Sequence, residues 1–93
     1  MASSATHLQV EVVTRTERLW HGVATSVSVP AIEGELGILV NRAPILAVLR
    51  EGRGRIAVEG GDPVAFHTSG GFVSVDSNFV TIVCESAEIV AGS

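Results

Sequence analysis

The sequence predicts an all-β domain in which short strands form a sandwich or a barrel. Three observations support this fold class. The 93 residues are 46% hydrophobic but only 4% aromatic, so the core must consist mainly of Val, Ile, Leu and Ala. β-Branched side chains fit pleated sheets. Turn residues also recur at short intervals, between runs in which apolar and polar residues alternate. A chain of this length forms one domain with a modest core.

The N-terminal third contains two expected strand regions. Over residues 8–12, apolar Leu and Val alternate with Gln and Glu, which places the apolar side chains on one face. A long run from Arg18 to Val29 follows. Four of its apolar residues have the same parity and are expected to share one face: Leu19, Val23, Val27 and Val29. The next strand is expected in "GELGILVNRAP", residues 34–44, with a polar turn at Asn41-Arg42.

The remaining strands are expected between glycine-rich and asparagine-rich turns. The segment "APILAVLREG" fits one short element of ambiguous type, and "GGDP" at residues 60–63 predicts a hairpin connection. "FVSV" and "FVTIVC" are expected to be two strands joined by a turn at residues 76–78. We expect one domain over residues 8–90, a flexible N-terminus over 1–7 and a tail over 91–93.

Composition excludes several classes of function. The formal net charge is −4, and all six basic residues are arginines, which makes nucleic acid a poor candidate partner. The absence of lysine excludes Schiff-base enzymes, P-loop nucleotide sites and lipoyl or biotinyl carriers. No signal peptide is evident, and the longest apolar run, residues 43–49, is far below the roughly 20 residues of a membrane helix. A lone Cys84 permits no internal disulfide and predicts a small buried side chain in a reduced, intracellular protein.

Candidate catalytic groups are few. Residues 52–57 match a loose G-x-G-x-x-G/A pattern, but they lead into a β run rather than a helix, so we interpret them as a turn with exposed arginine. The three histidines, His7, His21 and His67, lack metal-site spacing. A Cys84–His67 nucleophile pair and a Glu33–Glu35 acid–base pair can be drawn, but neither has a supporting sequence context. The residues therefore favour a non-catalytic interaction module that binds no metal or cofactor.

Three blocks, in order, resemble the epsilon subunit of F-type ATP synthases. They are "LQVEVVTRTERLWHGVATSVSVPAIEGELGIL", "EGELGILVNRAPILAVLREGRGRI" and "SGGFVSVDSNFVTIVCESAE". Together they span residues 8 to about 88, nearly the whole chain. The resemblance implies a flattened antiparallel β-sandwich of about ten short strands. It also implies a non-catalytic rotor subunit that joins the gamma subunit to the c-ring. Such a subunit would be peripheral to the cytoplasmic face of a bacterial plasma membrane, without direct lipid insertion.

The resemblance also suggests contact residues. In the family, a glutamate and a histidine of the second block lie near the polar loops of the c-ring, and these roles carry over to Glu35 and to the Asn41-Arg42 turn. Arg42 replaces the family histidine, and Val40 replaces a proline. Arginine keeps its positive charge at any physiological pH, so we hypothesise a pH-independent ring contact. The face that binds gamma is expected to carry some of five apolar residues on the last two long strands, which are Phe72, Val73, Val75, Phe79 and Val80.

Length is the second departure from the family. Its members commonly continue into a C-terminal helical hairpin that inhibits ATP hydrolysis and in some bacteria binds ATP. This sequence ends at Ser93, either as a natural short form or as a truncated piece, so neither property is expected of it as given. Two other classes of function stay open: a free-standing β-sandwich adaptor, and a small enzyme using His67, Cys84 or the Glu33–Glu35 pair.

Overall fold

The computed structural model describes residues 6–90, which form ten β-strands and no helix. The expected flexible N-terminus at 1–7 falls mostly outside these residues, and the expected tail at 91–93 falls wholly outside them. The strands are β1 (Leu8–Val13), β2 (Arg18–Ala24), β3 (Ser26–Ala31), β4 (Gly34–Leu39), β5 (Ile45–Leu49), β6 (Gly52–Ala57), β7 (Val64–Thr68), β8 (Gly71–Asp76), β9 (Phe79–Cys84) and β10 (Ala87–Val90). Within this part of the chain, no segment could cross a membrane as a helix.

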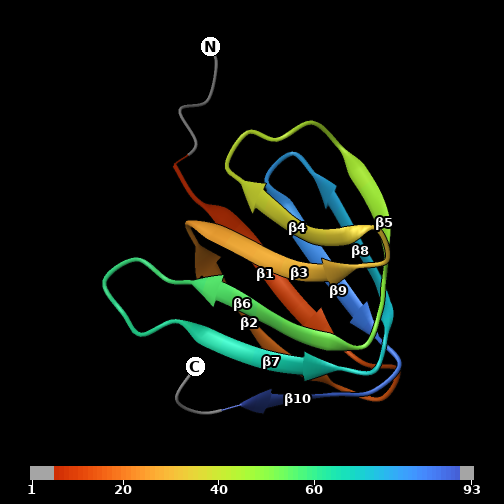
Figure 1. Ribbon diagram of the computed structural model, residues 1–93. Coiled ribbons are helices and arrows are strands. Elements are labelled where there is room, and N and C mark those ends of the chain that lie inside the picture. The colour runs from red at the N-terminus through yellow and green to blue at the C-terminus, as the bar shows by residue number, and fades with distance from the viewer. Residues whose placement is uncertain (1–5, 91–93) are drawn as a thin grey trace.

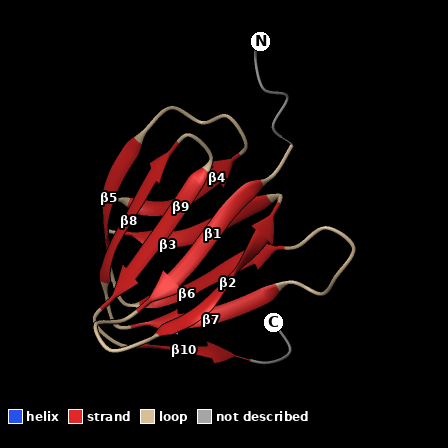
Figure 2. Cartoon of the chain, turned by 180° about the vertical axis from the view of Figure 1, so that it is seen from behind, coloured by secondary structure: helices blue, strands red, loops and turns tan. Residues whose placement is uncertain are grey.

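The strands form one hydrogen-bonded path that folds into two layers. The order is β10-β7-β6-β3-β5-β8-β9-β1-β2, and β4 pairs with β3 outside this path. The path bends at β3, which pairs with β6 through residues 26–28 and with β5 only through Ala31. Figure 1 shows β4, β3, β6, β7 and β10 in front of β8, β9, β1 and β2, and Figure 2 shows the second layer from behind. The expected β-sandwich of about ten strands is thus confirmed, although one pairing, between β1 and β9, is parallel.

The core lies between the layers, and β1, β8 and β9 contribute to it by alternation of buried and outward-facing side chains. Leu8, Val10 and Val12 of β1 are at most 3% exposed, as expected from the sequence. Inward-facing residues of β8 and β9 continue this layer, and Phe66 of β7 is the largest fully buried side chain. Tight packing of branched aliphatic side chains gives a stiff interior. The molecule therefore offers rigid outer faces rather than an internal chamber.

The expected single face along residues 18–29 is wrong. The run divides into β2 and β3, and Thr25 lies between them, where its backbone N–H donates to the carbonyl of Ala57 at 2.8 Å. β2 pairs with β1 in one layer and β3 pairs with β4 in the other, so the inward parity changes at this crossing. Ala24 and Val27 are consequently buried, whereas Val23 is 43% exposed.

Gly54 and Gly71 are required by close approaches. The glycine-rich segment at residues 52–57 is β6 itself rather than a turn. A Cβ atom on Gly54 would lie 2.3 Å from Cζ of Phe66, so this glycine makes room for the aromatic ring. Gly71 has a φ of +145°, and a Cβ there would lie 1.9 Å from the carbonyl oxygen of Val83. Both glycines therefore serve packing, and neither marks a nucleotide site.

Candidate interaction surfaces

A polar loop surface lies at one end of the sandwich, where the β4–β5 loop (residues 40–44) meets the β8–β9 turn (residues 76–78) (Figure 1). Asn41 and Asn78 both have positive φ values, 68° and 66°. The backbone N–H of Asn41 donates to Oδ1 of Asn78 at 2.6 Å, and Nδ2 of Asn78 donates to Oδ1 of Asn41 at 3.1 Å. The two loops are thus joined although they are far apart in sequence.

The structure places the three residues expected at the c-ring in two locations. Asn41 and Arg42 lie in the loop, and Arg42 is exposed with no ion pair or side-chain hydrogen bond among the described residues. Glu35 lies on β4, where Oγ of Ser28 donates to its Oε2 at 2.6 Å. At about 3.3 Å per strand residue, Glu35 is roughly 13 Å along β4 from Leu39, where the strand ends. Glu35 is therefore on the side of the sandwich, away from the Asn41-Arg42 turn.

An exposed apolar surface covers the outer face of the second layer. The apolar patch, as we call it, consists of the exposed Leu46, Val48 and Phe72, the half-buried Val83, and the exposed Ile32 of the β3–β4 turn, whose N–H donates to the carbonyl of Val48. Phe72 lies opposite Val48 on one neighbouring strand and opposite Val83 on the other, which forms a continuous cross-strand row. Leu46 is 70% exposed and Ile32 is 61% exposed. Such contiguous apolar exposure marks interaction sites in soluble domains.

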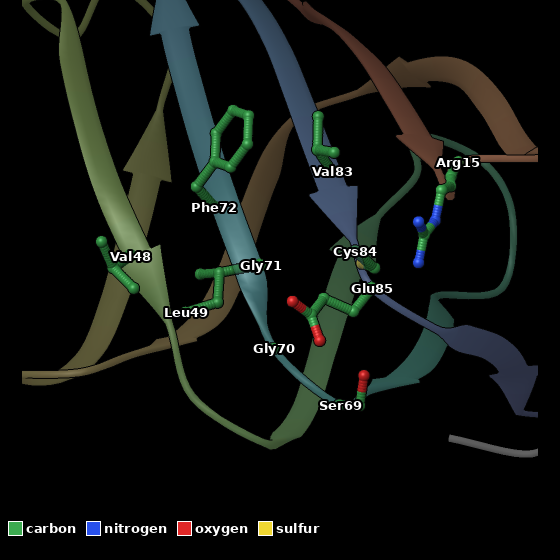
Figure 3. A pocket seen from close by; sticks show the side chains of 10 residues that line it. All are labelled: Arg15, Val48, Leu49, Ser69, Gly70, Gly71, Phe72, Val83, Cys84 and Glu85. Atoms are coloured by element: carbon green, nitrogen blue, oxygen red, sulfur yellow. The ribbon is translucent and has the colours of Figure 1, made fainter.

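Two shallow hollows border the apolar patch. One, of about 530 Å³, lies between the β3–β4 turn and β5, with Ile32, Leu46 and Glu33 in its lining. The other, of about 720 Å³, lies over the ends of β5, β8 and β9. Figure 3 shows Val48, Phe72 and Val83 around the second hollow, with Arg15 and Glu85 also in its lining. The patch thus combines apolar area with charged groups at its border, as in protein interfaces.

The residues expected to contact gamma divide into two groups. Val73, Val75 and Val80 are at most 2% exposed and belong to the core, because they occupy the inward positions of β8 and β9. Phe72 and Phe79 take the outward positions and are 43% and 61% exposed. Sequence reasoning missed Ile32, Leu46 and Val48, although the run "PILAVL" already indicated apolar residues at both alternating positions of β5.

The candidate catalytic groups do not converge. Cys84 is 2% exposed, and burial raises the pKa of its thiol, with a smaller opposing effect from a hydrogen bond with Thr68. His67 is exposed, and its Nε2 atom lies 3.8 Å from Oε2 of Glu51. No hydrogen bond links His67 to Cys84. Glu35 bonds Ser28 rather than acting with Glu33. Within residues 6–90, no group of three side chains could hold a metal ion.

Comparison with known proteins then identifies the family. Residues 7–90 match the family described as ATP synthase, Delta/Epsilon chain, beta-sandwich domain. The chain belongs to this family. It is 42% identical to the ATP synthase epsilon chain 2 of Ralstonia nicotianae over 80 residues, which cover 86% of this chain and 58% of the relative. It is 39% identical to the epsilon chain of Micrococcus luteus over 82 residues, which cover 88% of this chain and 90% of that protein.

Chains in solved structures of mitochondrial ATP synthases share the fold. A chain in the Euglena gracilis mitochondrial ATP synthase structure, described as OSCP/F1/c-ring, superposes with a TM-score of 0.88 at 21% identity, covering 95% of this chain and 56% of that one. A chain in the Tetrahymena thermophila central stalk and c-ring structure gives a TM-score of 0.70 at 20% identity, with coverage of 86% and 64%. The chain thus spans little more than half the length of several relatives that it matches.

Proposed function

We propose that this chain is a non-catalytic rotor subunit of a proton-translocating F-type ATP synthase. In this role it joins the gamma subunit to the c-ring and transmits rotation for ATP synthesis. The family match over residues 7–90 supports the proposal, and the apolar patch is the structural observation that carries it. A coupling subunit needs complementary surfaces and stiffness rather than a pocket, and the packed sandwich provides both. It would act at the cytoplasmic face of the bacterial plasma membrane without inserting into lipid.

The gamma subunit is the proposed occupant of the apolar patch. Fully burying one exposed leucine side chain contributes about 1.5–3 kcal/mol. Leu46 and Val48, at 70% and 55% exposed, therefore offer part of the binding energy that a stable interface needs. Phe72 adds an aromatic anchor beside them, which is typical of the centre of an interface. Of the gamma contacts expected from the sequence, this assignment retains Phe72. It places the centre of the gamma-binding surface on β5.

The c-ring is the proposed partner of the loop surface. Arg42 is exposed and unpaired in the described part of the chain, so its guanidinium is free to bond a ring carboxylate or carbonyl. Asn41 adjoins it with polar groups. Glu35 is proposed as a separate contact on the side of the sandwich, held in place by Ser28. The loop surface and the apolar patch occupy different parts of one rigid body, as coupling two partners requires.

A binding measurement with matched leucine variants tests the gamma assignment. Leu46→Asp removes apolar area from the patch, where Leu46 is 70% exposed. Leu39→Asp is the control, because Leu39 is similarly exposed, at 64%, but lies on the other layer. We expect Leu46→Asp to weaken binding to purified gamma at least tenfold, the equivalent of about 1.4 kcal/mol, and Leu39→Asp to change it less than threefold. Thermal unfolding of both variants checks the fold. Equal effects of the two variants would refute this docking face. A wild-type chain that does not bind gamma would favour the free-standing adaptor.

A further inference from the structure

Asn78 makes contacts that reach beyond its own turn. Its backbone carbonyl accepts from the N–H of Gln9 at 2.8 Å, so the turn is fixed to the start of β1. Its side chain accepts from the N–H of Asn41 and donates to the side chain of the same residue, as described above. Asn78 therefore ties the β4–β5 loop to the body of the sandwich through two bonds in opposite directions.

The turn conformation by itself does not require this side chain. A φ near +66° is adopted readily by glycine, so a turn at residues 76–78 would form without an amide there. The neighbouring Ser77 has a φ of 52°, and within residues 6–90 its hydroxyl donates only to Oδ1 of Asp76, at 3.2 Å. The carboxamide of Asn78 is distinctive because one group supplies both an acceptor and a donor, and Asn41 presents the matching donor and acceptor.

The β4–β5 loop has little else to hold it. Among the described residues, no other side-chain or turn hydrogen bond involves residues 40–44. Val40 packs against the core, but Asn41, Arg42, Ala43 and Pro44 are exposed. Freezing a loop before binding reduces the ordering entropy that binding must otherwise supply. The contact between Asn41 and Asn78 is thus the device that orders the segment carrying Arg42.

We propose that Asn78 is a positioning residue, which fixes the Asn41-Arg42 turn so that Arg42 is presented to the c-ring. This inference rests on the proposed ring contact of Arg42. Asn78 acts through Arg42 and does not itself bind the ring. Removal of its side chain frees the loop, and we expect about tenfold weaker binding to the ring from the loss of two hydrogen bonds that preorganise the loop.

The test compares Asn78→Gly with Ser77→Gly in the complex of this chain with gamma. Both variants put glycine at a positive-φ position of the same turn, but only Asn78→Gly removes the bonds to Asn41. Three quantities are measured: the affinity of the complex for purified c-ring in lipid nanodiscs, the amide hydrogen exchange of residues 40–43, and the affinity of this chain for gamma. For Asn78→Gly, exchange at Asn41 should accelerate at least tenfold and ring affinity should fall about tenfold. Its affinity for gamma should stay unchanged, and Ser77→Gly should match the wild type in all three.

The double variant decides whether Asn78 acts through Arg42. If it does, Arg42→Ala with Asn78→Gly binds the ring no more weakly than Arg42→Ala alone. A further tenfold loss in the double variant would overturn the positioning role. Wild-type ring affinity for Arg42→Ala would overturn the ring contact itself and the positioning role with it. In that case, faster exchange in Asn78→Gly would still show that the loop is held, so the two failures can be told apart.

Discussion

Gly54 and Phe66 provide a test of how the core is packed. A Cβ atom on Gly54 would lie 2.3, 2.6 and 2.9 Å from Cζ, Cε1 and Cε2 of Phe66, well inside the roughly 3.5–4.0 Å of a favourable carbon contact. Because the ring is fully buried, it cannot move aside freely. Overpacking of this kind costs about 1–3 kcal/mol, so Gly54→Ala should lower the free energy of unfolding by that amount.

The substitution Phe66→Leu removes those three ring atoms and no other part of the contact. In that background the added methyl group has room, and replacing glycine inside a strand by alanine contributes about 0.5–1 kcal/mol. Gly54→Ala should therefore be neutral or stabilising, which gives a coupling energy of about 1–4 kcal/mol between the two sites. Leucine costs less than the roughly 3–5 kcal/mol of truncating Phe to alanine, so the double variant should still fold.

Urea unfolding followed by the fluorescence of Trp20, the only tryptophan, measures all four proteins of the cycle. Gly61→Ala is the control, because a Cβ there would lie at an ordinary 3.5 Å from Val58. It should shift stability by less than about 0.5 kcal/mol in either background. An equal cost of Gly54→Ala with Phe or Leu at position 66 would refute the reasoning and would reopen another role for the glycine-rich segment.

Three further predictions concern single sites. Gly71 has a left-handed backbone conformation, and Gly71→Ala places a Cβ against the backbone of β9, so the substitution should lower the free energy of unfolding by more than about 3 kcal/mol. Gly37→Ala is the control, because the space around Gly37 is open, and it should not have this effect. Equal melting temperatures of the two variants would contradict this prediction. Burial raises the pKa of the Cys84 thiol in the folded state, so the unfolded state loses its proton first and stability should fall as the pH rises above about 8.5. Cys84→Ala should abolish this loss in urea titrations between pH 8 and 10, and an unchanged slope would disprove the assignment. With Arg42→His, the rate of proton-driven ATP synthesis by the reconstituted complex should fall as the pH rises through about 6.5, because histidine loses its charge there. The wild-type and Arg42→Lys complexes should share one pH–rate profile. Identical pH–rate profiles for arginine and histidine at position 42 would show that no charge is needed at this position.

The sequence by itself determined the fold class and much of the core. Alternation in β1 predicted the burial of Leu8, Val10 and Val12, and the apolar setting of Cys84 predicted its burial. The quoted blocks also led to the family that residues 7–90 match. Local patterns suffice for these conclusions because strand periodicity and turn chemistry are properties of neighbouring residues.

Tertiary structure alone decided which faces are exposed and which loops meet. Period-two alternation says that side chains take opposite sides, but the layer in which a strand pairs decides which side is inward. This is why the parity changed at Thr25, and why Val73 and Val75 are buried while Leu46 and Val48 are exposed. The contact between Asn41 and Asn78 joins residues 37 positions apart, and it exists because β5 pairs with β8 and β8 pairs with β9, which brings the turn beside the loop.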